Sequence, residues 1–228
     1  MPANMPGMNM SGATTVENSA ISPAALAISL TDQSGRAFTL GSLAGKTVVL
    51  ADFMTTCQET CPMTTVNLHD VAAAVNSAGL GKQVVVVQAT VDPDRDTPAR
   101  LAAYQKLYGV QPSWNLATAG PNTAQLWQAF GVSFTKTPED VPAPKDWLTG
   151  QPLTYDIDHD DAVFVIDPSG HLRWAAHGLA NTNGQKPPQE IYNFLSDEGR
   201  TNLEHPSGPQ WTVGDVTTEL AAVTGHTI

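Results

Sequence analysis

The sequence is poor in cysteine and in basic residues, and it has no long hydrophobic run. Two cysteines among 228 residues are too few for a disulfide framework or a four-cysteine zinc site. Acidic residues outnumber basic residues 22 to 11, and the net charge of −11 opposes binding to nucleic acid or to an anionic membrane surface. No run of residues approaches the roughly 18 apolar positions of a membrane span. These absences argue against disulfide-rich, nucleic-acid-binding and membrane-spanning proteins.

The hydrophobic content of 41 % is enough to fill one core, so we expect a single decorated domain over residues 23–228. Residues 1–22 have few large apolar side chains apart from methionine and are expected to form a disordered tail. Residues 178–213 form an extended, irregular C-terminal segment of the domain. The first thirty residues lack a basic stretch followed by an apolar core, so we expect that any export signal or anchor was removed.

Both cysteines lie in one polar loop between a predicted strand and a predicted helix. The strand is the apolar, β-branched run 47–53, and the helix carries an apolar stripe that ends near Gly79. Amides at a helix start lower the pKa of a nearby thiol, whereas Glu59 between the cysteines has the opposite effect, so the thiol pKa stays open. The spacing of Cys57 and Cys61 puts their sulfurs about one helical turn apart, within reach of one metal ion or a disulfide. The alternative is two unrelated cysteines of the core.

The remaining pattern alternates strands with helices, which is typical of an α/β fold. We expect a hairpin over 27–40, strands at 84–91 and 114–117, and a second hairpin over 162–175. Helices are expected over 97–109, 122–131, 191–195 and 215–223, and residues 135–152 are expected to form an excursion over the surface.

Three separated segments together resemble the Sco/SenC family: TTCQETCPMT, VDPDRDTP and DIDHDDAVFVIDPSG. The resemblance covers residues 24–177. It implies a thioredoxin-like fold, with a central mixed sheet flanked by helices, an N-terminal hairpin and surface insertions. It also implies a copper site, Cu(I) or Cu(II), formed by Cys57, Cys61 and His159. The chain departs from the family at Gln58, where a proline is usual, and in the long stretch after Gly178.

The resemblance implies a copper metallochaperone that delivers copper to the dinuclear copper site of cytochrome c oxidase. The alternatives are a thiol-disulfide oxidoreductase that reduces the cysteines of a copper-site partner, and a binding domain that uses neither thiol. The expected partners are the copper-site subunit of cytochrome c oxidase and another periplasmic copper carrier. We expect a monomer located outside the cytoplasm, in the periplasm or on the outer face of the cytoplasmic membrane.

Other residues are assigned auxiliary roles. His159 lies among aspartates that can orient its ring, although its position alone also fits a plain loop histidine. Asp92 follows the strand 84–91, and its carboxylate could contact a metal-binding side chain and adjust its properties. The alternative is that Asp92 only ends that strand. Met5, Met8 and Met10 could form a weak auxiliary Cu(I) site, because thioether sulfur is a soft donor; the plainer interpretation is a flexible linker.

Overall fold

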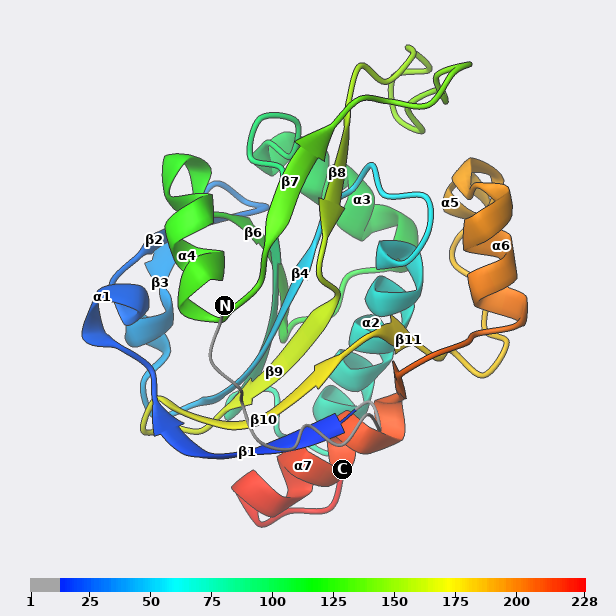
Figure 1. Cartoon of the computed structure of the whole chain (residues 1–228). Coiled ribbons are helices and arrows are strands. Elements are labelled where there is room, and N and C mark those ends of the chain that lie inside the picture. The colour runs from blue at the N-terminus through cyan, green and yellow to red at the C-terminus, as the bar shows by residue number, and fades with distance from the viewer. Residues whose placement is uncertain (1–12) are drawn as a thin grey trace, which may run out of the picture.

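The computed structural model describes residues 13–228, and a mixed eight-stranded sheet forms the centre of this region (Figure 1). The spatial order is β1 (Ala13–Ala20), β10 (His171–His177), β9 (Ala162–Ile166), β4 (Thr47–Phe53), β5 (Val84–Thr90), β6 (Trp114–Thr118), β2 (Ser29–Asp32) and β3 (Ala37–Thr39). Strands β4, β5 and β6 run parallel, and the other pairings are antiparallel. Every residue of β4 and β5 is buried, because helices cover both faces of the sheet.

Helices cover the two faces of the sheet unequally (Figure 1). Helices α2 (Cys61–Ser77), α3 (Pro98–Tyr108) and α7 (Val213–Thr224) lie on one face, while α4 (Thr123–Ala129) and the short α1 (Pro23–Leu26) lie on the other. Helix α3 begins where the sequence predicts, because the Thr97 hydroxyl accepts a hydrogen bond from the amide of Arg100 and a proline follows. Short 3-10 turns precede β4 and α4, at η1 (Leu40–Leu43) and η2 (Gly120–Asn122). The predicted fold class is therefore confirmed.

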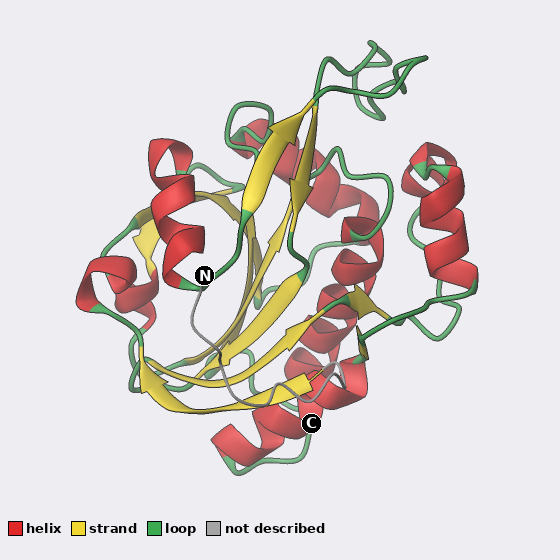
Figure 2. Ribbon diagram, viewed as in Figure 1, coloured by secondary structure: helices red, strands yellow, loops and turns green. Residues whose placement is uncertain are grey.

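A two-stranded antiparallel ribbon projects from the central sheet, as Figure 2 shows in yellow. It consists of β7 (Phe134–Thr137) and β8 (Asp156–His159). The predicted surface excursion connects the end of β7 to the start of β8, at the tip of the ribbon. On another side, β11 (Leu179–Ala180) pairs in parallel with β12 (Gln210–Trp211), and α5 (Gln189–Phe194) and α6 (Asp197–Glu204) lie between them in the chain. The cysteine loop follows the C-terminal end of β4. Both the ribbon and the segment that contains α5 and α6 contact this loop.

The structure corrects the prediction of a disordered tail for residues 13–20 only, because residues 1–12 lie outside the described residues. Residues 13–20 form β1, which pairs antiparallel with β10, because an edge strand can be extended through backbone hydrogen bonds that need no apolar side chains. The prediction of one helix in the C-terminal segment is also incomplete, since both α5 and α6 are present. Met5, Met8 and Met10 lie outside the described residues. Among the helices of residues 13–228, none is both long and apolar enough to cross a membrane.

Candidate metal centre

The cysteine loop lies where the sequence predicts, between the end of β4 and the start of α2. Cys61 is the first residue of α2, and Cys57 lies four residues before it in the loop. Both are free thiols, and their residues are only 5 % and 1 % exposed. The backbone amides of Thr60 and Cys61 each donate to Cys57 Sγ at 3.4 Å. The helix start therefore offers its unpaired amides to one sulfur, an arrangement that favours thiolate.

The third residue of the predicted set, His159, ends strand β8 and reaches the same place. Its Nε2 atom is 3.2 Å from Cys61 Sγ, although the two residues are 98 positions apart in the chain. The two sulfur atoms and the imidazole nitrogen lie within 4.8 Å of one another. Two thiolates and one imidazole form a soft ligand set with a low coordination number, and such a set suits Cu(I). The residues present thus fit a single soft metal ion.

Asp52 fixes the orientation of the His159 ring. Its Oδ2 atom is 2.6 Å from His159 Nδ1, while its Oδ1 atom accepts a hydrogen bond from the amide of Ala162 at 2.8 Å. The carbonyl of Asp160 lies 3.0 Å from the same ring nitrogen. Two acceptors at Nδ1 assign the proton of the neutral ring to that atom, which leaves the Nε2 lone pair directed toward the cysteines. Such a carboxylate–histidine pair is common behind metal-bound histidines.

The three side chains have shifted pKa values. A hydrogen bond from the Cys61 thiol holds the pKa of Cys57 well below its usual value, against the effect of burial, and His159 acts in the same direction. Burial, together with the neighbouring Cys57 thiolate, raises the pKa of Cys61 well above its usual value. Burial alone would lower the pKa of His159, but the Asp52 carboxylate raises it well above the normal value. Without a metal ion, these shifts favour the thiolate form of Cys57, the thiol form of Cys61 and the protonated form of His159.

Acidic side chains line a cleft of about 360 Å³ beside these residues. Burial is the largest cause of a raised pKa for two of them, which is about 7 for Glu59 and about 7 for Asp161. Cys57 and His159 also line the cleft. Its acidic residues come from the cysteine loop, the ribbon with its excursion, the loop before β9, and α6: Glu59, Asp140, Asp156, Asp158, Asp161 and Glu198.

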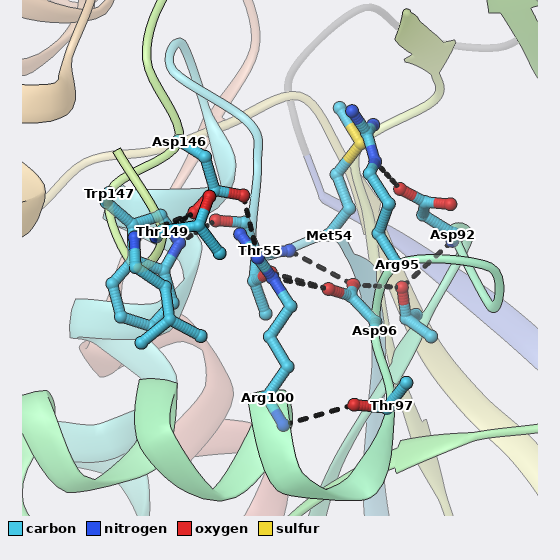
Figure 3. Close-up of polar contacts among 12 residues, drawn as sticks. Met54, Thr55, Asp92, Arg95, Asp96, Thr97, Arg100, Asp146, Trp147 and Thr149 are labelled. Carbon is cyan, nitrogen blue, oxygen red and sulfur yellow. Dashed lines mark hydrogen bonds and ion pairs between the residues drawn. The ribbon is translucent and has the colours of Figure 1, made fainter. Parts of the chain in front are cut away.

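The base of the cysteine loop is held at Thr55, whose three polar groups all bond to distant parts of the chain (Figure 3). Its amide donates to Asp96 Oδ2 at 3.1 Å, and its hydroxyl donates to Asp96 Oδ1 and accepts from Arg100 Nε. Its carbonyl accepts a hydrogen bond from Trp147 Nε1 at 2.8 Å. Arg100 also bonds to Asp146 at 2.7 Å, so the surface excursion is attached to α3 and to the loop together.

Asp92 has different neighbours from those expected of a residue behind the metal ligands. Its carboxylate accepts hydrogen bonds from Tyr155 Oη at 2.9 Å and from Arg95, and its amide donates to the Thr90 hydroxyl. Figure 3 shows the Asp92–Arg95 pair on one side of Thr55, with Asp146 and Trp147 on the other side. Asp52, which the sequence analysis did not single out, contacts the histidine instead. One sequence feature could have indicated the role of Asp52. It is a lone carboxylate inside a strand that is buried along its whole length, and a buried charge needs a partner.

The fold and this Cys-Cys-His arrangement define a thioredoxin-like protein with a candidate soft-metal centre. The family model for SCO1/SenC matches residues 22–189, which is most of the chain, and the chain belongs to this family. The resemblance inferred from three sequence segments is thereby confirmed.

Individual relatives agree with this assignment. A SCO2-like protein of Rickettsia conorii is 24 % identical over 170 residues, which are 74 % of this chain and 74 % of that protein. The crystal structure of Arabidopsis thaliana ScoI with copper bound is 25 % identical, with a TM-score of 0.52 over 64 % of this chain and 82 % of that one. The structure of BsSco, described as a member of the Sco family of cytochrome c oxidase assembly proteins with a disulfide switch, has a TM-score of 0.51 at 18 % identity, covering 71 % of this chain and 84 % of that one.

Proposed function

We propose that this chain is a copper metallochaperone that binds copper through Cys57, Cys61 and His159. The observation that carries the proposal is that the two sulfurs and the Nε2 atom converge within 4.8 Å. The copper-bound ScoI structure of Arabidopsis thaliana, a member of the same family, supports copper as the metal. Copper is the cargo in this function, and the chain supplies two soft thiolates and an imidazole held by Asp52.

The proposed recipient is the dinuclear copper site of cytochrome c oxidase, in its copper-site subunit. The description of the Sco family as cytochrome c oxidase assembly proteins supports this choice. Three protein ligands leave room for a thiolate or imidazole of the recipient to attack, so copper can move by ligand exchange. Cys57 and His159 line the acidic cleft, which favours a partner that presents basic residues around its own ligands.

We propose that the protein works outside the cytoplasm, in the periplasm or on the outer face of the cytoplasmic membrane, and that another periplasmic copper carrier loads it. Fractionation of cells that express the full-length protein tests the location. Recovery in the cytoplasmic fraction would contradict it.

A competition titration with a Cu(I) chelator under reducing conditions tests copper binding. We expect the wild type to bind one tight equivalent, and Cys57→Ser, Cys61→Ser and His159→Ala to bind at least about tenfold more weakly. His69→Ala is the matched control, because that histidine bonds to Asp70 and Gln111. Equal Cu(I) affinity of the wild type and His159→Ala would defeat the proposal.

A thiol-disulfide oxidoreductase remains the second candidate, because both thiols are free and the pKa of Cys57 is lowered. In this reaction the Cys57 thiolate attacks a partner disulfide, and Cys61 then displaces the partner's sulfur. The partner gains two electrons, one proton from the Cys61 thiol and one proton from solvent as the Cys57–Cys61 disulfide forms. This chemistry needs no histidine ligand. His159→Ala should therefore retain disulfide exchange if reduction is the function, and lose copper binding if copper carriage is.

A further inference from the structure

Helix α6 packs directly against the segment between the two cysteines, although it lies beyond residues 22–189 that match the family model. The amide of Ser196, which precedes α6, donates to the Gln58 carbonyl at 3.3 Å. The side-chain amide of Asn202 donates to the Glu59 carbonyl at 3.5 Å. Two successive carbonyls of the cysteine loop are therefore held by one helix.

At Gly199 the backbone of α6 comes so close to the loop that a side chain has no room. A Cβ atom at this position would lie 1.9 Å from the Gln58 carbonyl oxygen and 3.2 Å from Glu59 Cα. Because real Cβ atoms essentially never come within 3.0 Å of another heavy atom, any larger residue would force the two backbones apart by about 1.1 Å. The obstacle is backbone rather than a flexible side chain, so rotation of a side chain cannot relieve it.

Backbone conformation does not explain the glycine. Gly199 lies within a helix and is not among the glycines with positive φ, so an alanine could adopt its backbone angles. Glycine inside a helix is less favourable than alanine by about 1 kcal/mol. Helix α6 thus carries an unfavourable residue at a position where its backbone meets the cysteine loop, and the close contact is the physical reason for it.

We propose that α6 is a positioning element for the metal centre, and that Gly199 makes this positioning possible. Gln58 has no ring to fix its φ angle, so contacts from outside the loop add to the hydrogen bonds within it that hold the residues between Cys57 and Cys61. Thr55 is held on one side of Cys57 by Asp96 and Trp147, and α6 holds the two residues on the other side. The helix thereby keeps the Cys57 sulfur in place opposite Cys61 and His159.

The test compares Gly199→Ala with Gly214→Ala, a glycine-to-alanine change in α7 whose Cβ would meet only Thr212 Oγ1 at 3.5 Å, an ordinary contact. The first measurement is hydrogen exchange of the amides of residues 57–61 in the reduced, metal-free protein. We expect faster exchange there in Gly199→Ala and wild-type exchange in Gly214→Ala. The second measurement is Cu(I) affinity, which we expect to fall about tenfold or more in Gly199→Ala only.

Asn202→Ala is the second variant, because it removes one hydrogen bond to the loop without adding volume. We expect it to accelerate exchange at the same amides by a smaller factor. If both variants change exchange only within α6, and residues 57–61 and the Cu(I) affinity stay as in the wild type, α6 is merely packed there and the proposal is wrong.

The affinity measurement rests on the proposed copper function, whereas the exchange measurement does not. A wild type that fails to bind Cu(I) tightly would refute copper carriage, and the positioning role would then be decided by exchange in the metal-free protein alone.

Discussion

The change Asp52→Asn tests how the histidine ligand is held. In the wild type, one carboxylate oxygen lies 2.6 Å from His159 Nδ1 and the other accepts the amide of Ala162 at 2.8 Å. Both oxygens therefore face N–H donors. Asparagine has the same shape but only one acceptor, so its amino group must oppose one of these donors. The ring loses its charged partner in either case, and it also loses its fixed orientation when the amino group faces Nδ1.

We expect Asp52→Asn to weaken Cu(I) binding by about 10- to 100-fold, which corresponds to about 1.4–2.7 kcal/mol. The measurement is competition with a Cu(I) chelator. The control is Asp158→Asn, which makes the same chemical change on an exposed aspartate of β8, next to the histidine. If the two variants bind Cu(I) with equal affinity, the carboxylate behind the ring contributes nothing to the site.

The pH dependence gives a second check, because protons compete with copper for His159. Asp52 raises the pKa of His159, and it strengthens the affinity of the ring for protons as well as for copper. In Asp52→Asn the pKa of His159 is lower, so protons compete less with copper for this ring at low pH. The weaker competition partly offsets the weaker copper binding of the variant. The affinity ratio of wild type to Asp52→Asn should therefore increase as pH rises. A ratio that decreases with pH would show that the proton and copper effects of Asp52 are not linked in this way.

Three further predictions concern the thiols, the tail and the loop base. Oxidation to a Cys57–Cys61 disulfide should abolish tight copper binding, because neither sulfur remains a thiolate donor; mass spectrometry that finds the disulfide in a tightly metallated sample would contradict this. Deletion of residues 1–12 should remove a second, weaker Cu(I) equivalent and leave the tight one unchanged; an unaltered titration would make the tail a linker. Burial raises the pKa of Asp146, but the hydrogen bonds that its carboxylate accepts from Arg100 and from two backbone amides have a larger, opposite effect. The pKa of Asp146 therefore lies below its usual value. Asp146→Asn should therefore lower the free energy of unfolding in urea by about 1–3 kcal/mol at pH 7. That difference should shrink as pH falls below about 4, because the wild-type carboxylate is then protonated; a difference independent of pH would refute the role of its charge.

The sequence was sufficient for features that depend on local pattern. The apolar run 47–53 and the cap at Thr97 predicted β4 and the start of α3, because hydrophobic periodicity and capping act over a few residues. The C-x3-C loop was likewise found at the start of α2. By contrast, β1 forms by backbone pairing with an edge strand, and this pairing leaves little mark in the sequence of residues 13–20.

The parts of the site that depend on distant contacts were not predicted. Asp52 lies 107 positions from His159, and nothing near either residue indicates that they meet. Gly199 is ordinary in sequence, since only the backbone of Gln58 in the folded chain shows why no side chain fits there. The histidine itself was found because its surrounding segment resembles a family, whereas its position alone would have left it a loop histidine.

The ribbon of β7 and β8 has a consequence for how the metal and the fold depend on each other. Four residue pairs join its strands, and His159 at its base lies 3.2 Å from the sulfur of Cys61 at the start of α2. A bound ion would therefore act as a crosslink between two parts of the chain that are far apart in sequence. At a free copper concentration of 100 times the dissociation constant, such a link adds about 2.7 kcal/mol to the free energy of unfolding. If copper is transferred as proposed, the transfer removes that amount, so the copper-free protein is the form that unfolds more easily.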